Sequence, residues 1–93
     1  MPRAIINPDE LHRFAADLGI MVGMLRDRRN TVNAEFKALR EAWQDKKYEQ
    51  FERSFSEMIA RFNRFTDESE HYAKYLHAKA RKAEEYLQGG YGR

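Results

Sequence analysis

Residues 48–86 read YEQFERSFSEMIARFNRFTDESEHYAKYLHAKARKAEEY and carry a seven-residue repeat. With Tyr48 at position a, apolar or aromatic residues fill positions a and d at nearly every repeat, the exceptions being Ser69 and Lys79. The other members are, at position a, Tyr48, Phe55, Phe62, Leu76 and Ala83 and, at position d, Phe51, Met58, Phe65, Tyr72 and Tyr86. Because the pattern persists for so many repeats, it predicts one long amphipathic helix that packs along a seam. We expect this helix over residues 47–88, before Gly89 and Gly90 end it.

An earlier pattern predicts another long helix over residues 8–42. Asn7 can accept hydrogen bonds as the N-cap, and Pro8 suits the first helical position. Every seventh residue is then apolar, giving the column Leu11, Leu18, Leu25, Val32 and Leu39. Beside it we expect a second column whose spacing changes from three to four residues, made of Phe14, Met21, Val22, Phe36 and Trp43.

The apolar pattern breaks at residues 43–47, which predicts a turn between the two helices. Asp45 can cap the second helix, and a connection this short makes the helices antiparallel neighbours. The sequence therefore predicts an all-α fold, an antiparallel two-helix hairpin in a single domain over residues 1–93. Residues 89–93 are expected to form a flexible tail.

Large apolar side chains extend beyond what one hairpin can cover, because two helices share only one face. With no cysteine to staple the chain, we expect it to dimerise into a four-helix bundle. Gly19 and Gly23 follow Ala15 at intervals of four residues; this strip either lets a partner's aromatic rings approach the backbone or consists of tolerated exposed glycines. The residues expected in the core or dimer seam are Leu11, Phe14, Leu18, Gly19, Gly23, Leu25, Val32, Phe36, Leu39, Tyr48, Phe51, Phe55, Met58, Phe62, Phe65, Tyr72 and Leu76.

The composition excludes several classes of function. The 93 residues include no cysteine, and 17 basic residues nearly balance 15 acidic ones, for a net charge of +2. We expect no nucleic-acid partner, since the basic clusters are diluted by acids and the aromatic residues follow the seam. No apolar run is long enough for a membrane span. The first eight residues lack the apolar core of a signal peptide, so we expect synthesis in the cytoplasm and, if the protein is secreted, export without such a signal.

The residues at the turn carry a family resemblance. Two amphipathic helices, a length of about 100 residues and a tryptophan at the turn resemble the WXG100 (ESAT-6-like) family, and the resemblance covers residues 7–87. The family's Trp-x-Gly motif corresponds here to Trp43-Gln44-Asp45, with aspartate in place of glycine. The resemblance implies a small leaderless hairpin that forms a homodimer, or a heterodimer with a related helical protein. It also implies a type VII (ESX) secretion substrate or adaptor, with a secretion ATPase or a larger effector as further partners.

One signal of that family is missing. Many members carry Tyr-x-x-x-Asp/Glu after the second helix, whereas here Tyr72, Tyr75 and Tyr86 are followed four residues later by Leu76, Lys79 and Gly90. Either a partner supplies the signal or this branch works without the usual export machine. The alternative function is a helical adaptor or chaperone for a larger toxin or other protein, without export of its own.

Catalytic, cofactor and metal sites are not expected. The three histidines are scattered, and no nucleophile, base and acid are arranged together. Glu68 and His71 match the Glu-x-x-His spacing of di-iron bundles, but the repeat places them on the flank and outer face. We therefore expect a protein that is not an enzyme and binds no cofactor.

Two features have open interpretations. Arg28 or Arg29 lies opposite about residue 60 and either pairs inside the bundle with Glu57 or Glu35, or extends outward. Trp43 either plugs the closed end of the hairpin or forms part of a recognition surface for a partner.

Overall fold

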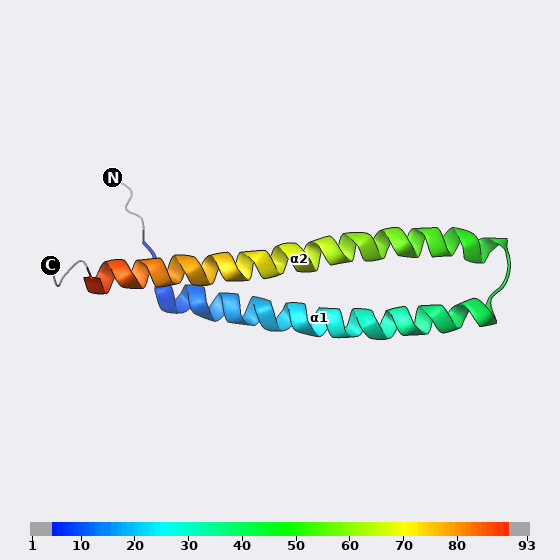
Figure 1. Cartoon of the computed structure of the whole chain (residues 1–93), viewed down its shortest axis with the longest axis horizontal. Coiled ribbons are helices and arrows are strands. Elements are labelled where there is room, and N and C mark those ends of the chain that lie inside the picture. The colour runs from blue at the N-terminus through cyan, green and yellow to red at the C-terminus, as the bar shows by residue number, and fades with distance from the viewer. Residues whose placement is uncertain (1–4, 90–93) are drawn as a thin grey trace.

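The protein folds as two long helices, α1 (Pro8–Ala42) and α2 (Lys46–Gly89), which run antiparallel along each other (Figure 1). This computed structural model describes residues 5–89 and extends over 71 Å. The predicted all-helical hairpin is confirmed. Gly89 is the last residue of α2, while residues 90–93 of the expected tail and the first four residues lie outside the described part. Neither helix has a segment long and apolar enough to span a membrane within residues 5–89.

Side-chain caps fix both helix starts. Asn7 Oδ1 accepts a hydrogen bond from the Glu10 backbone N–H at 3.2 Å. Asp45 Oδ1 accepts hydrogen bonds from the backbone N–H groups of Lys47 at 2.8 Å and Tyr48 at 3.1 Å. Among the described residues no backbone φ is positive, and Trp43 ends α1 in an extended conformation. The turn therefore closes without the freedom of a glycine, and Asp45 can stand where the Trp-x-Gly pattern has one.

Positions a and e of α2, rather than a and d, face α1. Tyr48, Phe55 and Ser69 at position a are buried, and Phe62 and Leu76 are half-buried. Beside them lies a column at position e, four residues after each a, containing Ile59, Thr66, Ala73 and Ala80. Most of the predicted d column instead lies outside the contact between the helices: Met58, Phe65, Tyr72 and Tyr86 are exposed, whereas Phe51, although partly exposed, contacts the rings of Phe36 and Trp43. Small residues at position e let the helices approach closely, and large rings at d would not fit between them.

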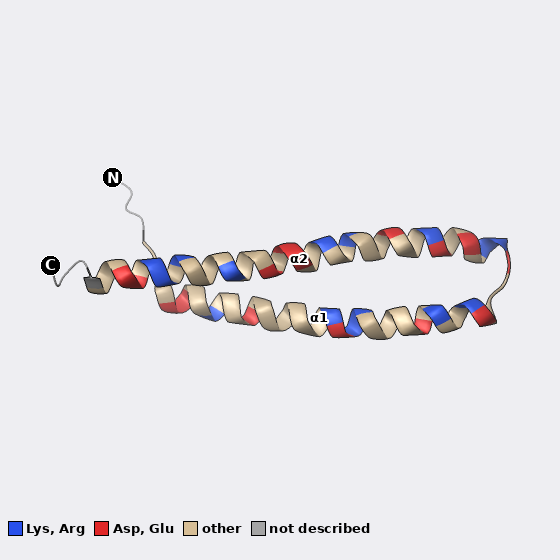
Figure 2. Cartoon of the chain, viewed as in Figure 1, with Lys and Arg blue, Asp and Glu red and all other residues tan. Residues whose placement is uncertain are grey.

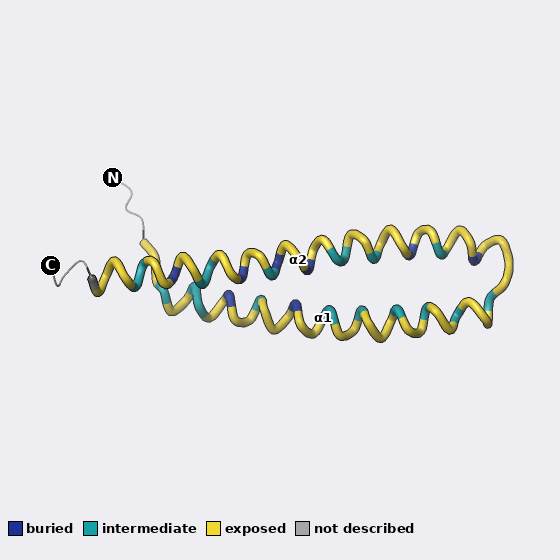
Figure 3. The backbone as a smooth tube through the Cα atoms, viewed as in Figure 1, coloured by how far each residue is buried: buried dark blue, intermediate teal, exposed yellow. Residues whose placement is uncertain are grey.

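Positions a and e also form the inner face of α1, where Leu11 stands at position a. The leucine column is half-buried, although Val32 at its fourth place is exposed. A second column, at position e, follows each member of the leucine column by four residues; it consists of Ala15, Val22, Arg29, Phe36 and Trp43. The predicted use of Phe14 and Met21 in this column is wrong for the hairpin contact, since both side chains are exposed. The inner face thus keeps one spacing along the whole helix, with no change from three to four. Figure 3 shows the buried and half-buried positions along the facing sides of both helices.

The core changes in character along the hairpin. Near the chain ends the buried residues are small, with Ala15, Ala73 and Ala80 almost fully covered. Near the turn they are aromatic, and the rings of Phe36 and Phe55 stack with centroids 4.3 Å apart. Figure 1 shows the gap between the ribbons widening toward the turn, as larger side chains between the helices require.

Candidate functional site

The hairpin has two flanks of opposite character. In an antiparallel helix pair, equivalent heptad positions of the two helices fall on the same side of the contact. With a and e in the contact, position b of both helices lies along one flank and position d along the other. The b positions include His12, Arg26, Asn63, Glu70 and Glu84. Most d positions are apolar, among them Phe14, Met21, Phe51, Phe65 and Tyr72, and the charged exceptions are Arg28, Glu35 and Lys79. We call these the polar flank and the apolar flank.

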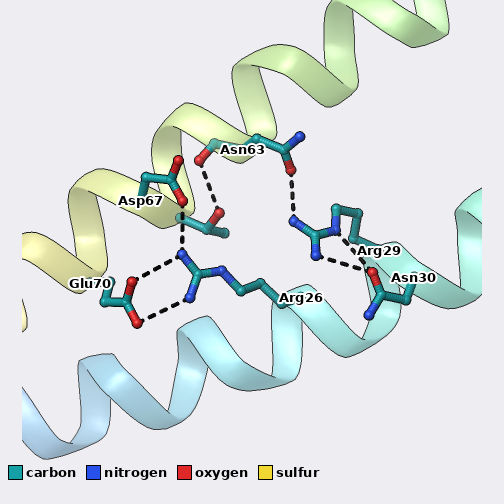
Figure 4. A network of polar contacts seen from close by, with 7 residues as sticks. Arg26, Arg29, Asn30, Asn63, Asp67 and Glu70 are labelled. Atoms are coloured by element: carbon teal, nitrogen blue, oxygen red, sulfur yellow. Dashed lines mark hydrogen bonds and ion pairs between the residues drawn. The ribbon is translucent and has the colours of Figure 1, made fainter.

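Arg26 forms the centre of the polar flank. Its guanidinium donates to Asp67 Oδ1 at 2.9 Å and lies 3.2 Å from Glu70 Oε2, joining α1 to two successive turns of α2 (Figure 4). The hydrogen bond with Glu70 raises the pKa of Arg26. The same bond, followed by the positive charges of Arg26 and Lys74, lowers the pKa of the Glu70 carboxyl. Both shifts favour the charged forms and hence the pairing of the two helices.

Arg29, and not Arg28, turns toward the other helix. Its Nη1 donates to Asn63 Oδ1 at 2.9 Å, and its side chain also donates to Asn30 of its own helix (Figure 4). The two carboxylates considered as partners from the sequence, Glu57 and Glu35, are exposed and do not pair with it. Arg29 belongs to position e of α1 and therefore faces α2, whereas Arg28 belongs to position d and is exposed.

A histidine pair joins the helices near the chain ends. His12 Nδ1 and His77 Nδ1 lie 2.7 Å apart, and His12 Nε2 lies 3.3 Å from Glu84 Oε1. Their sequence separation is 65 residues, so this contact exists only when the hairpin is closed. In the sequence these histidines are scattered, and they meet only because the turn sets which residues of the two helices lie opposite each other.

At the other end, Trp43 covers the aromatic core beside the turn. It is half-buried, and its ring centroid lies 5.6 Å from those of both Tyr48 and Phe51. Next to it, Arg40 Nη2 donates to Glu52 Oε2 at 2.6 Å across the helices. These contacts agree with the interpretation of Trp43 as a structural plug.

The apolar flank carries the exposed aromatic and methionine side chains. Its members are exposed by 39% to 76% of their surface, namely Phe14, Met21, Phe51, Met58, Phe65, Tyr72 and Tyr86. Arg28 of α1 and Met58 of α2 line one small hollow, which places the d positions of the two helices on the same side. Five of the seven members belong to α2, so the apolar surface is most continuous along that helix.

The glycine strip lies away from this surface. Gly19 and Gly23 occupy positions b and f, and an added Cβ at either would meet nothing within 4 Å. Ala15, the third member of the strip, is instead buried against α2. Within the hairpin itself, no close approach explains the two glycines.

The described residues provide little for chemistry at a metal or an anion. Residues 5–89 contain no group of three or more histidine, aspartate or glutamate side chains placed to hold a metal ion. Glu68 and His71 are both exposed. Lysine and arginine alternate with aspartate and glutamate along both helices (Figure 2). The apolar flank is therefore the candidate functional site.

Comparison of the chain with protein-family models, curated proteins and solved structures gives no match.

Proposed function

We propose that this chain is a non-enzymatic interaction protein that pairs through its apolar flank with a second helical hairpin, either another copy or a related chain. The pair would form a four-helix bundle. By its resemblance to WXG100 proteins, we further propose that it serves as a small type VII secretion substrate or adaptor. The observation that carries the proposal is the apolar flank, an extended surface that the hairpin does not cover.

The size of this flank supports pairing. A fully exposed aromatic side chain presents about 200 Å², so seven side chains exposed by 39% to 76% leave about 700 Å² of mainly apolar surface. The largest apolar patch on a typical monomeric protein is about 300–600 Å². A stable protein interface buries about 800 Å² on each partner. The flank therefore has roughly the area of one side of a stable dimer.

The turn supports the resemblance on physical grounds. Trp43 closes the aromatic end of the hairpin, and Asp45 caps α2 through two backbone hydrogen bonds. Asp45 thus ends the turn by capping α2, at the position where the family has a glycine. This supports the relation between Trp43-Gln44-Asp45 and the Trp-x-Gly turn.

The test for pairing is molar mass by light scattering after size exclusion, over a range of micromolar concentrations. Phe65→Lys places a charge at the middle of the apolar flank, and Ala60→Lys places the same charge at an exposed position on the outer face of α2. We expect a dimer for the native chain and for Ala60→Lys, and a monomer for Phe65→Lys. A well-behaved native monomer would exclude self-pairing; mixing with the related hairpin then tests heterodimer formation, and failure of both would refute the proposal.

The test for export is separate. The tagged protein is followed in culture medium and cells of the native host, with and without the secretion ATPase. We expect ATPase-dependent appearance in the medium. Retention in the cell in stable complex with a larger protein would instead establish the alternative, a non-exported adaptor.

A further inference from the structure

We propose that His12 and His77 form a proton-sensitive clasp that holds the end of the hairpin remote from the turn closed and releases it when both rings are protonated. The distance of 2.7 Å between their Nδ1 atoms fits a direct N–H···N hydrogen bond. One ring must donate and the other accept, so only one hydrogen fits between these two nitrogens. The clasp is a property of the single hairpin and does not depend on the proposed pairing or export.

Glu84 sets which ring accepts. A carboxylate is an acceptor, and its Oε1 lies 3.3 Å from His12 Nε2, so Nε2 of His12 carries the hydrogen. His12 Nδ1 is then left with its lone pair, and His77 Nδ1 must donate. This assignment satisfies all three groups with both rings neutral.

The two nitrogens that can still take up a proton have different roles in the contact. A first proton can bind to His77 Nε2, which leaves the N–H···N bond between the rings intact and charge-assisted. A second proton has to bind His12 Nδ1, the nitrogen that accepts this bond. Two N–H groups then point at each other within 2.7 Å, and two positive rings repel, so the contact breaks. The experiments below therefore compare pH 8 with pH 5, the range over which histidine side chains in general change charge.

The surrounding charges do not offset this repulsion. The charged residues on this flank within one turn of either histidine, or in contact with one, are Asp9, Arg13, Lys74, Arg81 and Glu84. Arg13 is paired with Glu10 on its own helix, and the remaining two acids and two bases are balanced. Glu84 contacts His12 alone, so it supports one positive ring but not the pair.

The local packing makes this end responsive. The buried residues nearby are the small Ala15, Ala73 and Ala80, whereas the stacked rings that join the helices lie toward the turn. Loss of the clasp therefore removes polar contacts that join the helices at the chain ends, and the turn end keeps its stacked rings. We expect separation at one end rather than unfolding of the hairpin.

Pulsed electron-spin resonance measures this separation directly, because the chain has no native cysteine to compete for labels. Spin labels at Ala16→Cys and Ala78→Cys, both exposed, report on the clasped end. Labels at Ala38→Cys and Ser54→Cys, also exposed, report on the turn end as the matched control. Excess unlabelled protein removes distances between chains. From pH 8 to pH 5 we expect the first distance to lengthen and broaden while the second stays constant; no change at the first pair, or equal change at both, would overturn the proposal.

Thermal unfolding of substituted chains identifies the groups. His77→Gln keeps a hydrogen-bonding side chain but cannot take up a proton, and His71→Gln is the control at an exposed histidine of the same helix. We expect the melting temperature of the native chain to fall by about 5 °C from pH 8 to pH 5, the size of a lost local contact. His71→Gln should show the same fall and His77→Gln less than half of it. An equal fall in all three chains would show that other groups titrate.

Discussion

Replacement of Trp43 by alanine tests the aromatic plug at the turn. Full removal of a buried tryptophan side chain costs about 3–5 kcal/mol, and Trp43 is half-buried. Its two ring contacts, each with a centroid distance of 5.6 Å to Tyr48 and Phe51, would be lost as well. Such pairs contribute about 0.5–1.5 kcal/mol each. Half of the full burial cost, added to part of the energy of the two lost ring pairs, gives a destabilisation of about 2–3 kcal/mol.

The measurement is urea unfolding followed by circular dichroism at 222 nm, at one fixed protein concentration because pairing would add to apparent stability. Gln44→Ala, at the adjacent exposed residue, is the control and should change stability by less than about 0.5 kcal/mol. Trp43→Phe should recover most of the loss. A destabilisation below about 1 kcal/mol in Trp43→Ala would refute the assignment of this side chain as the plug.

Three further predictions concern the ends and flanks of the helices. Asp45→Ala removes the acceptor for two backbone N–H groups of α2 and should cost about 1 kcal/mol in urea unfolding, while Asp45→Asn should retain most of it. Because the pKa of Glu70 is lowered in the folded chain, its contribution is present above the unfolded value and lost as pH falls through the folded one. Acid titration of the melting temperature below about pH 5 should therefore be shallower for Glu70→Gln than for the native chain, and identical curves would contradict this. Gly19→Ala and Gly23→Ala should each stabilise the hairpin by about 1 kcal/mol, since an added Cβ meets nothing within 4 Å. Because the strip lies off the apolar flank, neither change should alter the oligomeric state measured by light scattering. Loss of the dimer would show that a partner packs on the glycine strip.

The hairpin itself could be predicted from the sequence because its signals are local. Asn7 and Asp45 cap the helices as their positions indicate. The repeat at position a also identifies the buried column of α2, with Tyr48 and Phe55 inside. These features depend on residues within a few positions of each other along the chain, where periodicity and capping rules apply directly.

The choice of the second column could not be predicted from the same pattern. Phe65 and Thr66 are neighbours in sequence, and hydrophobicity alone favours the phenylalanine for the core. The structure buries Thr66 completely and leaves half of Phe65 exposed. The outcome depends on the size of the residues that the other helix presents, such as Ala15, which is a property of the pair and not of either helix. The same use of position e in place of position d explains why Arg29 faces α2 and Arg28 is exposed.

The sequence separations across the hairpin imply an order of assembly. Arg40 and Glu52 are 12 residues apart, whereas His12 and Glu84 are 72 apart. Closing the longer loop directly from the unfolded chain would cost about 1.6 kcal/mol more in chain entropy than closing the shorter one. Contacts beside the turn should therefore form first. Contacts between successive helical turns then form in order from the turn toward the termini. In reverse, unfolding begins with fraying at the termini, and the hydrogen-bonded helical amides beside the stacked rings of Phe36 and Phe55 should be the last to exchange.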